Sequence, residues 1–246
     1  IGTLSTTDPD AGNTFTYTLV AGSGDTDNAS FNISSSSLRI NSSPNYEAKS
    51  SYSVRIRTTD QGSLTYEEAF TITINDRNET PTDISLSSST VNENVAANTT
   101  IGTLSSTDPD AANTFTYTLV AGSGSTDNVS FNISGSNLRI NSSPDFEAKS
   151  SYSVRIRTAD QGSQIYEKVF TITIGDVNES PTDISLSAPS VDENVAANTT
   201  IGTLNSTDPD ASNTFTYSLV AGSGDTDNAS FSIDGTSLRI SNSPNY

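Results

Sequence analysis

Pairs of acidic residues recur along this chain at a fixed spacing, and their carboxylates are the groups best suited to chemistry. Asp108 and Asp110 flank a proline, directly before a stretch with apolar residues at every second position. The same Asp-Pro-Asp triplet stands at positions 8–10 and 208–210. Hard oxygen donors of this kind suit Ca²⁺, which takes about 6–8 oxygens in irregular geometry, whereas Mg²⁺ demands a tighter octahedron. The pattern therefore predicts calcium binding.

An acid judged alone has a simpler reading, because Asp also forms turns and caps strand ends. What favours a cation is the whole set, which repeats with its spacing and carries few neighbouring basic residues. Carboxylates that converge repel one another unless a cation lies between them. An EF-hand loop is excluded, since the sixth and twelfth places counted from Asp108 hold Asn113 and Leu119 instead of Gly and Glu.

The composition excludes several classes of function. The formal net charge is −18, from 29 acidic and 11 basic residues, so the surface repels nucleic acid and anionic membranes. His and Cys are both absent, which removes the commonest general base, disulfides and thiolate zinc sites. No nucleophile elbow or phosphate loop occurs. Paired carboxylates could cleave glycosides, but acids kept in every copy indicate architecture, so we predict that the protein is not an enzyme.

The polarity of the chain indicates an extracellular or cell-surface protein. Hydrophobic residues make up 32% of the chain, and no run of 18 apolar residues occurs, so we expect no membrane insertion in this segment. The chain begins in the middle of a repeating pattern at Ile1, which indicates a fragment of a longer protein.

Long repeats organise the sequence. Residues 1–81 and 101–181 are identical at 65 of 81 positions, and a third copy begins at Ile201. A period of one hundred residues matches an autonomous domain better than a solenoid unit. The connector at 176–181 sets the phase. We therefore predict a truncated repeat over 1–80, a complete repeat over 81–180 and a truncated repeat over 181–246.

Alternating patterns predict seven strands and no helix in the complete repeat. In residues 152–158 and 166–174, for example, apolar side chains share one face and Thr, Ser or Arg the other. Such alternation is typical of antiparallel sheets with one solvated face. The fold class expected is all-β, as tandem seven-stranded Greek-key β-sandwiches of about one hundred residues each. The strands expected cover 84–87, 100–104, 114–120, 130–133, 138–141, 152–158 and 166–174.

Five short motifs in the complete repeat resemble the cadherin repeat family, in its bacterial tandem form. In chain order they are Asn92-Glu93-Asn94, Asp108-Pro109-Asp110, Asp145-Phe146-Glu147, Ala159-Asp160-Gln161 and the connector Asp176-Val177-Asn178-Glu179. Each motif is weak alone, but their order is specific, and the resemblance covers the whole chain.

The resemblance implies calcium sites shared between adjacent repeats of the same chain. The first junction would use Glu47, Asn78, Glu79, Asp108, Asp110 and Asp160, with Asn113 offering a backbone carbonyl. The second would use Glu93, Asp145, Glu147, Asn178, Glu179, Asp208 and Asp210. Asp8, Asp10 and Asp60 would face a preceding repeat, and Glu193 a following one. Two departures stand out: Asn45 replaces the first acid of the Asp-x-Glu motif, and Arg77 stands where the second connector has Val177.

The function that these patterns favour is structural. The segment would belong to a long bacterial surface adhesin or stalk that calcium stiffens at each joint, for adhesion or projection. Two alternatives stay open: a module that binds surface polysaccharide or like chains, because Thr, Ser and Asn side chains line the expected exposed faces, and a subunit of a self-assembling extracellular fibre.

Overall fold

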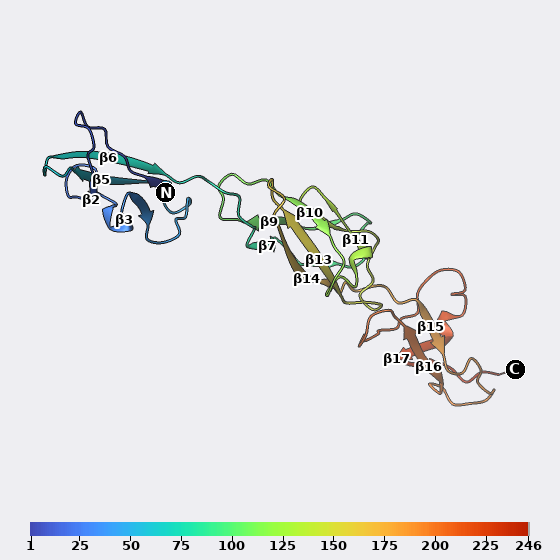
Figure 1. Ribbon diagram of the computed structural model, residues 1–246. Coiled ribbons are helices and arrows are strands. Elements are labelled where there is room, and N and C mark those ends of the chain that lie inside the picture. Colours follow the sequence, from blue (N-terminus) through green and yellow to red (C-terminus); the bar gives the residue numbers. More distant parts are fainter. Residues whose placement is uncertain (246) are drawn as a thin grey trace. The chain divides into compact units, whose positions relative to one another are not determined.

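The computed structural model describes residues 1–245 and consists of short strands joined by turns (Figure 1). The alternating sequence pattern accounts for the strands, since apolar residues at every second position bury one face of each sheet. Three one-turn 3₁₀ helices precede equivalent strands in the three repeats, and the sequence analysis missed them. They are η1 (Asn28–Ser30), η2 (Asn128–Ser130) and η3 (Asn228–Ser230).

The first repeat forms two three-stranded antiparallel sheets with the orders β1-β4-β3 and β2-β5-β6. Its strands are β1 (Gly2–Thr3), β2 (Thr16–Leu19), β3 (Phe31–Ser34), β4 (Ser37–Ile40), β5 (Ser51–Thr59) and β6 (Thr65–Thr73). Phe31, Leu38, Val54 and Ile56 form its buried core.

The complete repeat forms two four-stranded sheets with the orders β11-β12-β9-β7 and β10-β13-β14-β8. Its strands are β7 (Asp83–Leu86), β8 (Thr90–Asn92), β9 (Thr100–Thr107), β10 (Thr116–Leu119), β11 (Phe131–Ser134), β12 (Asn137–Ile140), β13 (Ser151–Ala159) and β14 (Ile165–Gly175). Ile84, Leu138, Val154 and Ile172 are fully buried, as the alternation in these strands requires.

The third repeat contributes one four-stranded sheet with the order β15-β16-β18-β17. Its strands are β15 (Asp183–Leu186), β16 (Thr200–Thr207), β17 (Phe231–Asp234) and β18 (Ser237–Ile240). All of its strand pairs are antiparallel.

The seven predicted strands of the complete repeat are all present, and the all-β sandwich class is confirmed. One strand of the complete repeat was not predicted: β8 pairs with β14 in parallel, with Val91 opposite Ile174. Three residues are too few to show an alternating pattern, so the sequence analysis missed β8.

By compactness the described chain divides into two units. The first comprises Ile1–Ser85, Leu104–Thr118 and Ile156–Lys168, and the second comprises Leu86–Thr103, Leu119–Arg155 and the residues from Val169 onward. This division does not follow the repeat boundaries expected near residues 80 and 180, which stay a prediction.

Candidate metal centres

A short turn before β5 presents Glu47. Its first residue, Asn45, accepts a hydrogen bond at Oδ1 from the Ala48 amide (2.8 Å), and its backbone carbonyl accepts one from the Lys49 amide (3.0 Å). Lys49 pairs with Asp27, and Asp27 Oδ2 accepts a hydrogen bond from the Ser53 amide (2.8 Å). The turn that carries Glu47 is therefore closed by Asn45 and tied to the sheet through Lys49 and Asp27.

The loop after β9 presents Asp108 and Asp110. Asp108 Oδ1 accepts a hydrogen bond from the Asp110 amide at 3.0 Å, which closes a tight turn around the proline. Ala112 has a φ of 60°, in the left-handed region where a side chain is rarely found. Gly12 takes this place in the first repeat with a φ of 82°. The loop is thus held in one strained conformation that directs its carboxylates.

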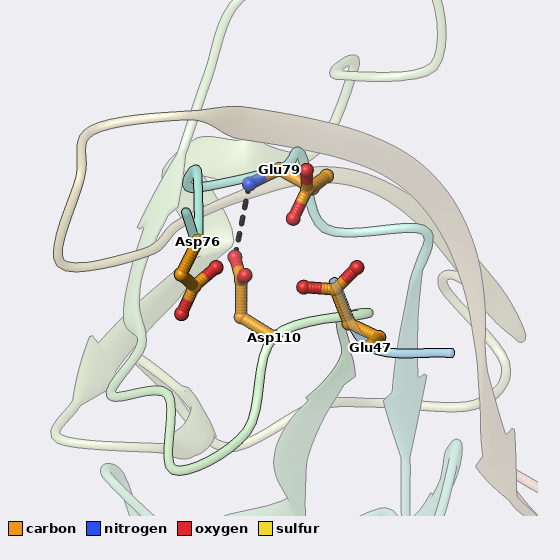
Figure 2. Close-up of side chains that lie close together, drawn as sticks. All are labelled: Glu47, Asp76, Glu79 and Asp110. Carbon is orange, nitrogen blue, oxygen red and sulfur yellow. Dashed lines mark hydrogen bonds between the residues drawn. The ribbon is translucent and has the colours of Figure 1, made fainter. Parts of the chain in front are cut away.

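Glu47, Asp76, Glu79 and Asp110 meet in what we call the Glu79 cluster (Figure 2). Each of the four offers a carboxylate oxygen, and these oxygens all lie within 4.8 Å of one another. The Glu79 amide donates a hydrogen bond to Asp110 Oδ2 at 2.9 Å, which joins the connector to the loop after β9. All four residues belong to the first compact unit.

Crowding makes the Glu79 carboxyl group resist ionisation. Partial burial, a hydrogen bond with Asp110 and the negative charges of Glu47, Asp110 and Asp76 raise the pKa of Glu79. Glu79 Oε2 and Asp108 Oδ2 are buried oxygens that have no hydrogen-bond partner. An unpaired buried carboxylate oxygen is costly, so both atoms are acceptors that lack a positive partner.

Asn78 connects the same region to the loop between β13 and β14. Its Nδ2 donates hydrogen bonds to Asp160 Oδ2 (2.8 Å) and to the Glu79 carbonyl (2.9 Å). A Cβ placed on Gly162 would lie 2.4 Å from Asn78 Cγ, so only glycine leaves room for this side chain. A cavity of about 250 Å³ opens beside it, lined by Asp76, Asn78, Asp110, Ala111 and Gln161.

A second set of acids, which we call the Glu147 cluster, consists of two overlapping groups. One comprises Glu93, Glu147 and Asp176, and the other comprises Glu147, Glu179 and Asp210. Glu147 belongs to both groups. All five residues lie in the second compact unit.

Glu93 is the buried member of this cluster, with 3% of its surface exposed. Its two carboxylate oxygens accept hydrogen bonds from the Phe146 amide (2.7 Å) and the Val177 amide (2.9 Å). Backbone donors of this kind stabilise a buried negative charge. One carboxylate thus fastens both the turn that carries Glu147 and the connector that follows β14.

Electrostatic crowding is also evident in the Glu147 cluster. Desolvation, together with the charges of neighbouring acids, raises the pKa values of Glu147, Asp176 and Glu179. The pKa of Asp210 is lowered, because its carboxylate accepts a hydrogen bond from the Glu179 amide at 2.8 Å. Glu179 Oε2 and Asp210 Oδ1 are buried without a hydrogen-bond partner.

The donor sets fit a hard divalent cation. Ca²⁺ holds oxygens at about 2.3–2.6 Å, so ligands on opposite sides of one ion are roughly 4.6–5.2 Å apart. The cluster oxygens lie within 4.8 Å of one another, close enough for one ion to contact them, and the buried unpaired oxygens supply acceptors. These are two independent features that a Ca²⁺ ion would satisfy.

The structure brings together only part of the residue set expected from sequence. Glu47, Glu79, Asp110, Glu93, Glu147, Glu179 and Asp210 join the described clusters. Asp160 and Asn78 contact each other beside the Glu79 cluster, and Asn178 donates to the Glu179 carbonyl. The others lie outside the described clusters, and their role as ligands stays a prediction: Asp8, Asp10, Asp60, Asp108, Asn113, Asp145, Glu193 and Asp208.

Sequence reasoning missed two members, Asp76 and Asp176. Both open the connector two residues before Asn78 and Asn178, and this shared position was the available signal. Asp145 illustrates the opposite case, because its Oδ1 accepts a hydrogen bond from the Ala148 amide at 2.8 Å, as Asn45 does from Ala48. An amide and a carboxylate can both fill this capping role.

Comparisons with known proteins show the fold. No family model matches the chain, and a search of curated proteins found no match. Among solved structures, Protocadherin Gamma B2 extracellular cadherin domains 1-5 align with a TM-score of 0.62 and 20% identity over 94% of this chain and 47% of that one. Mouse Cadherin-23 EC22-24 aligns with a TM-score of 0.63 and 23% identity over 99% of this chain and 81% of that one. Human CDH23 EC21-23 aligns with a TM-score of 0.60 and 22% identity over 94% of this chain and 80% of that one.

The chain thus has a cadherin-like fold of tandem β-sandwich repeats. It spans about half the length of the protocadherin structure. In the part of the chain that the structure describes, residues 1–245, none of the helices has the length and apolar character needed to cross a bilayer.

Proposed function

We propose that this chain is a calcium-stiffened segment of a long extracellular adhesin or stalk. The observation that carries the proposal is the pair of acid clusters, each centred on a connector between repeats and each holding at least one buried carboxylate oxygen without a partner. Cadherin extracellular domains as structural neighbours support an adhesion-type module, and the repeated motifs support a tandem array.

The chain's own residues would act by holding one another in place. When bound, Ca²⁺ supplies positive charge that offsets the repulsion among the carboxylates. Glu93 anchors one connector through the Val177 amide, and Asn78 anchors the other through Asp160. Without a cation, like charges push the connector away from the loops that face it. The connectors are therefore the parts of the chain whose order depends on the ion.

Cell-surface location and a bacterial source belong to this proposal. An excess of acidic over basic residues is compatible with an extracellular, calcium-rich environment. A structural role also agrees with the composition of the clusters. Both use equivalent acids, such as Glu79 and Glu179, so the same kind of site recurs along the chain instead of occurring once.

Small-angle scattering of the chain, with millimolar calcium and after its removal, tests this function. We expect the maximum dimension to be well defined with calcium and to broaden without it, while circular dichroism of the strands stays the same. The double variant Glu79→Gln, Glu179→Gln should resemble the calcium-free state even when calcium is present. Identical scattering profiles in both conditions would contradict the proposal.

A further inference from the structure

Gln161, in the loop between β13 and β14, joins two loops that meet at the Glu79 cluster. Its Oε1 accepts a hydrogen bond from the Thr114 amide at 3.0 Å, and its Nε2 donates to Asn113 Oδ1. Asn113 in turn donates from Nδ2 to the Asp110 carbonyl at 3.2 Å. Gln161 also lines the 250 Å³ cavity with Asp76 and Asp110.

The bridge secures the end of the loop that carries the metal-binding carboxylates. Asp108 and Asp110 stand at its start, where the Asp110 amide bonds back to Asp108. Thr114 stands at its end, and between them Ala112 adopts a φ of 60°. A loop that holds a strained residue keeps its shape only when both ends are fixed. Gln161 supplies the second fixed point.

Both polar atoms of the Gln161 side chain are engaged by the loop, so this side chain acts through its neighbours rather than as a ligand. The adjacent residue, Asp160, accepts the hydrogen bond from Asn78. The tripeptide Asp160–Gly162 thus contacts the connector on one side and the Asp108–Thr114 loop on the other.

The first repeat contains the same bridge without a cluster beside it. Gln61 Oε1 accepts from the Thr14 amide at 2.9 Å, and Nε2 donates to Asn13 Oδ1. Asp8 and Asp10 lie outside the described clusters. Gln61 therefore makes the same contacts away from the Glu79 cluster, which makes it a matched control.

We propose that Gln161 is a positioning residue that presets the Asp108–Thr114 loop for cation binding at the Glu79 cluster. The inference rests on the proposed function and goes beyond it, since it assigns the shape of the site to a residue with no charge. Partners that orient metal ligands typically change metal affinity by about 10–100-fold, and we expect about 10-fold for an exposed amide such as this one.

The test is a calcium titration of the full chain followed by two-dimensional NMR. The Glu79 amide signal reports the Glu79 cluster and the Glu179 amide signal reports the Glu147 cluster. In Gln161→Met, the midpoint of the Glu79 signal should move to about 10-fold higher calcium, with the Glu179 midpoint unchanged. Gln61→Met should move neither signal.

A readout without calcium separates positioning from general stability. In calcium-free buffer, hydrogen exchange at the Thr114 amide should accelerate in Gln161→Met, and exchange at β13 amides should not. Gln161→Ala repeats both measurements with a smaller side chain. Equal calcium midpoints in Gln161→Met and Gln61→Met, or a parallel shift of the Glu179 signal, would overturn the inference. Failure of the unmodified chain to bind calcium would instead overturn the proposed function.

Discussion

The two acid clusters contain equivalent residues in different surroundings. Glu79 and Glu179 occupy the same connector position, and each donates its amide to the second acid of an Asp-Pro-Asp loop, at 2.9 and 2.8 Å. The Glu147 cluster includes the buried Glu93, and Asp160 and Asn78 lie beside the Glu79 cluster. A connector can therefore be held by an upstream carboxylate and by a downstream loop.

Glu147 should be the most sensitive residue in this comparison. It belongs to both groups of its cluster, whereas its counterpart Glu47 belongs to one. We expect Glu147→Gln to weaken calcium binding by about 100-fold and Glu47→Gln by about 10-fold, because a ligand should matter at least as much as an orienting partner. Calorimetric titration measures both. Equal losses would show that sharing between the two groups has no consequence.

Removing the buried anchor should loosen only one connector. Glu93→Ala leaves the Phe146 and Val177 amides without their acceptor, which we expect to cost about 1–3 kcal/mol of unfolding free energy in calcium-free urea denaturation. Glu193→Ala changes the exposed equivalent in the third repeat and should cost less than Glu93→Ala. The idea of an upstream anchor fails if the two variants denature alike.

The downstream anchor can be tested with a pair of glycines. Gly162→Ala places a Cβ within 2.4–2.6 Å of the Asn78 side chain, whereas the same change at Gly62 meets only Asp60 Oδ1 at 3.3 Å. We expect Gly162→Ala to cost about 1 kcal/mol, at the low end for overpacking because Asn78 can move. It should also weaken calcium binding at the Glu79 cluster. Thermal unfolding and titration check this, and a larger effect from Gly62→Ala would contradict it.

The smallest expected effect is that of pH on the calcium-free chain. Glu79, Glu147, Asp176 and Glu179 have raised folded-state pKa values. A raised pKa means that the folded state binds protons more tightly, so these groups destabilise it above their unfolded pKa of about 4. That penalty disappears as the pH falls through the folded pKa values. The difference in melting temperature between calcium-loaded and calcium-free protein should therefore be smaller at pH 5 than at pH 7.5.

If the difference in melting temperature were instead larger at pH 5 than at pH 7.5, other carboxylates would dominate the pH dependence of stability. Asp27, Asp83 and Asp127 have lowered pKa values through hydrogen bonds and pairing with lysines, and they stabilise the fold above their unfolded pKa. Comparing Glu79→Gln, Glu179→Gln with the unmodified chain separates the two contributions, since only the cluster contribution is lost in that variant.

Most of the fold was predictable because local pattern and burial agree in this chain. The alternation in β13 and β14 leaves Val154, Ile156 and Ile172 fully buried, as the sequence indicates. Glu79 and Glu179 were predicted by motif order, whereas Asp76 and Asp176 shared only a connector position, and a sequence does not show which carboxylates of a connector turn toward the facing loop.

What the amino-acid sequence determined by itself is the one-hundred-residue period, the strand alternation and the position of the acids at strand ends. Tertiary structure alone decided which segments pair. β12 pairs with β9 rather than with β13, which follows it in sequence, and the three-residue β8 joins β14 in parallel. A strand needs a neighbour for its amides and a facing sheet for its side chains, and neither is encoded in the strand itself.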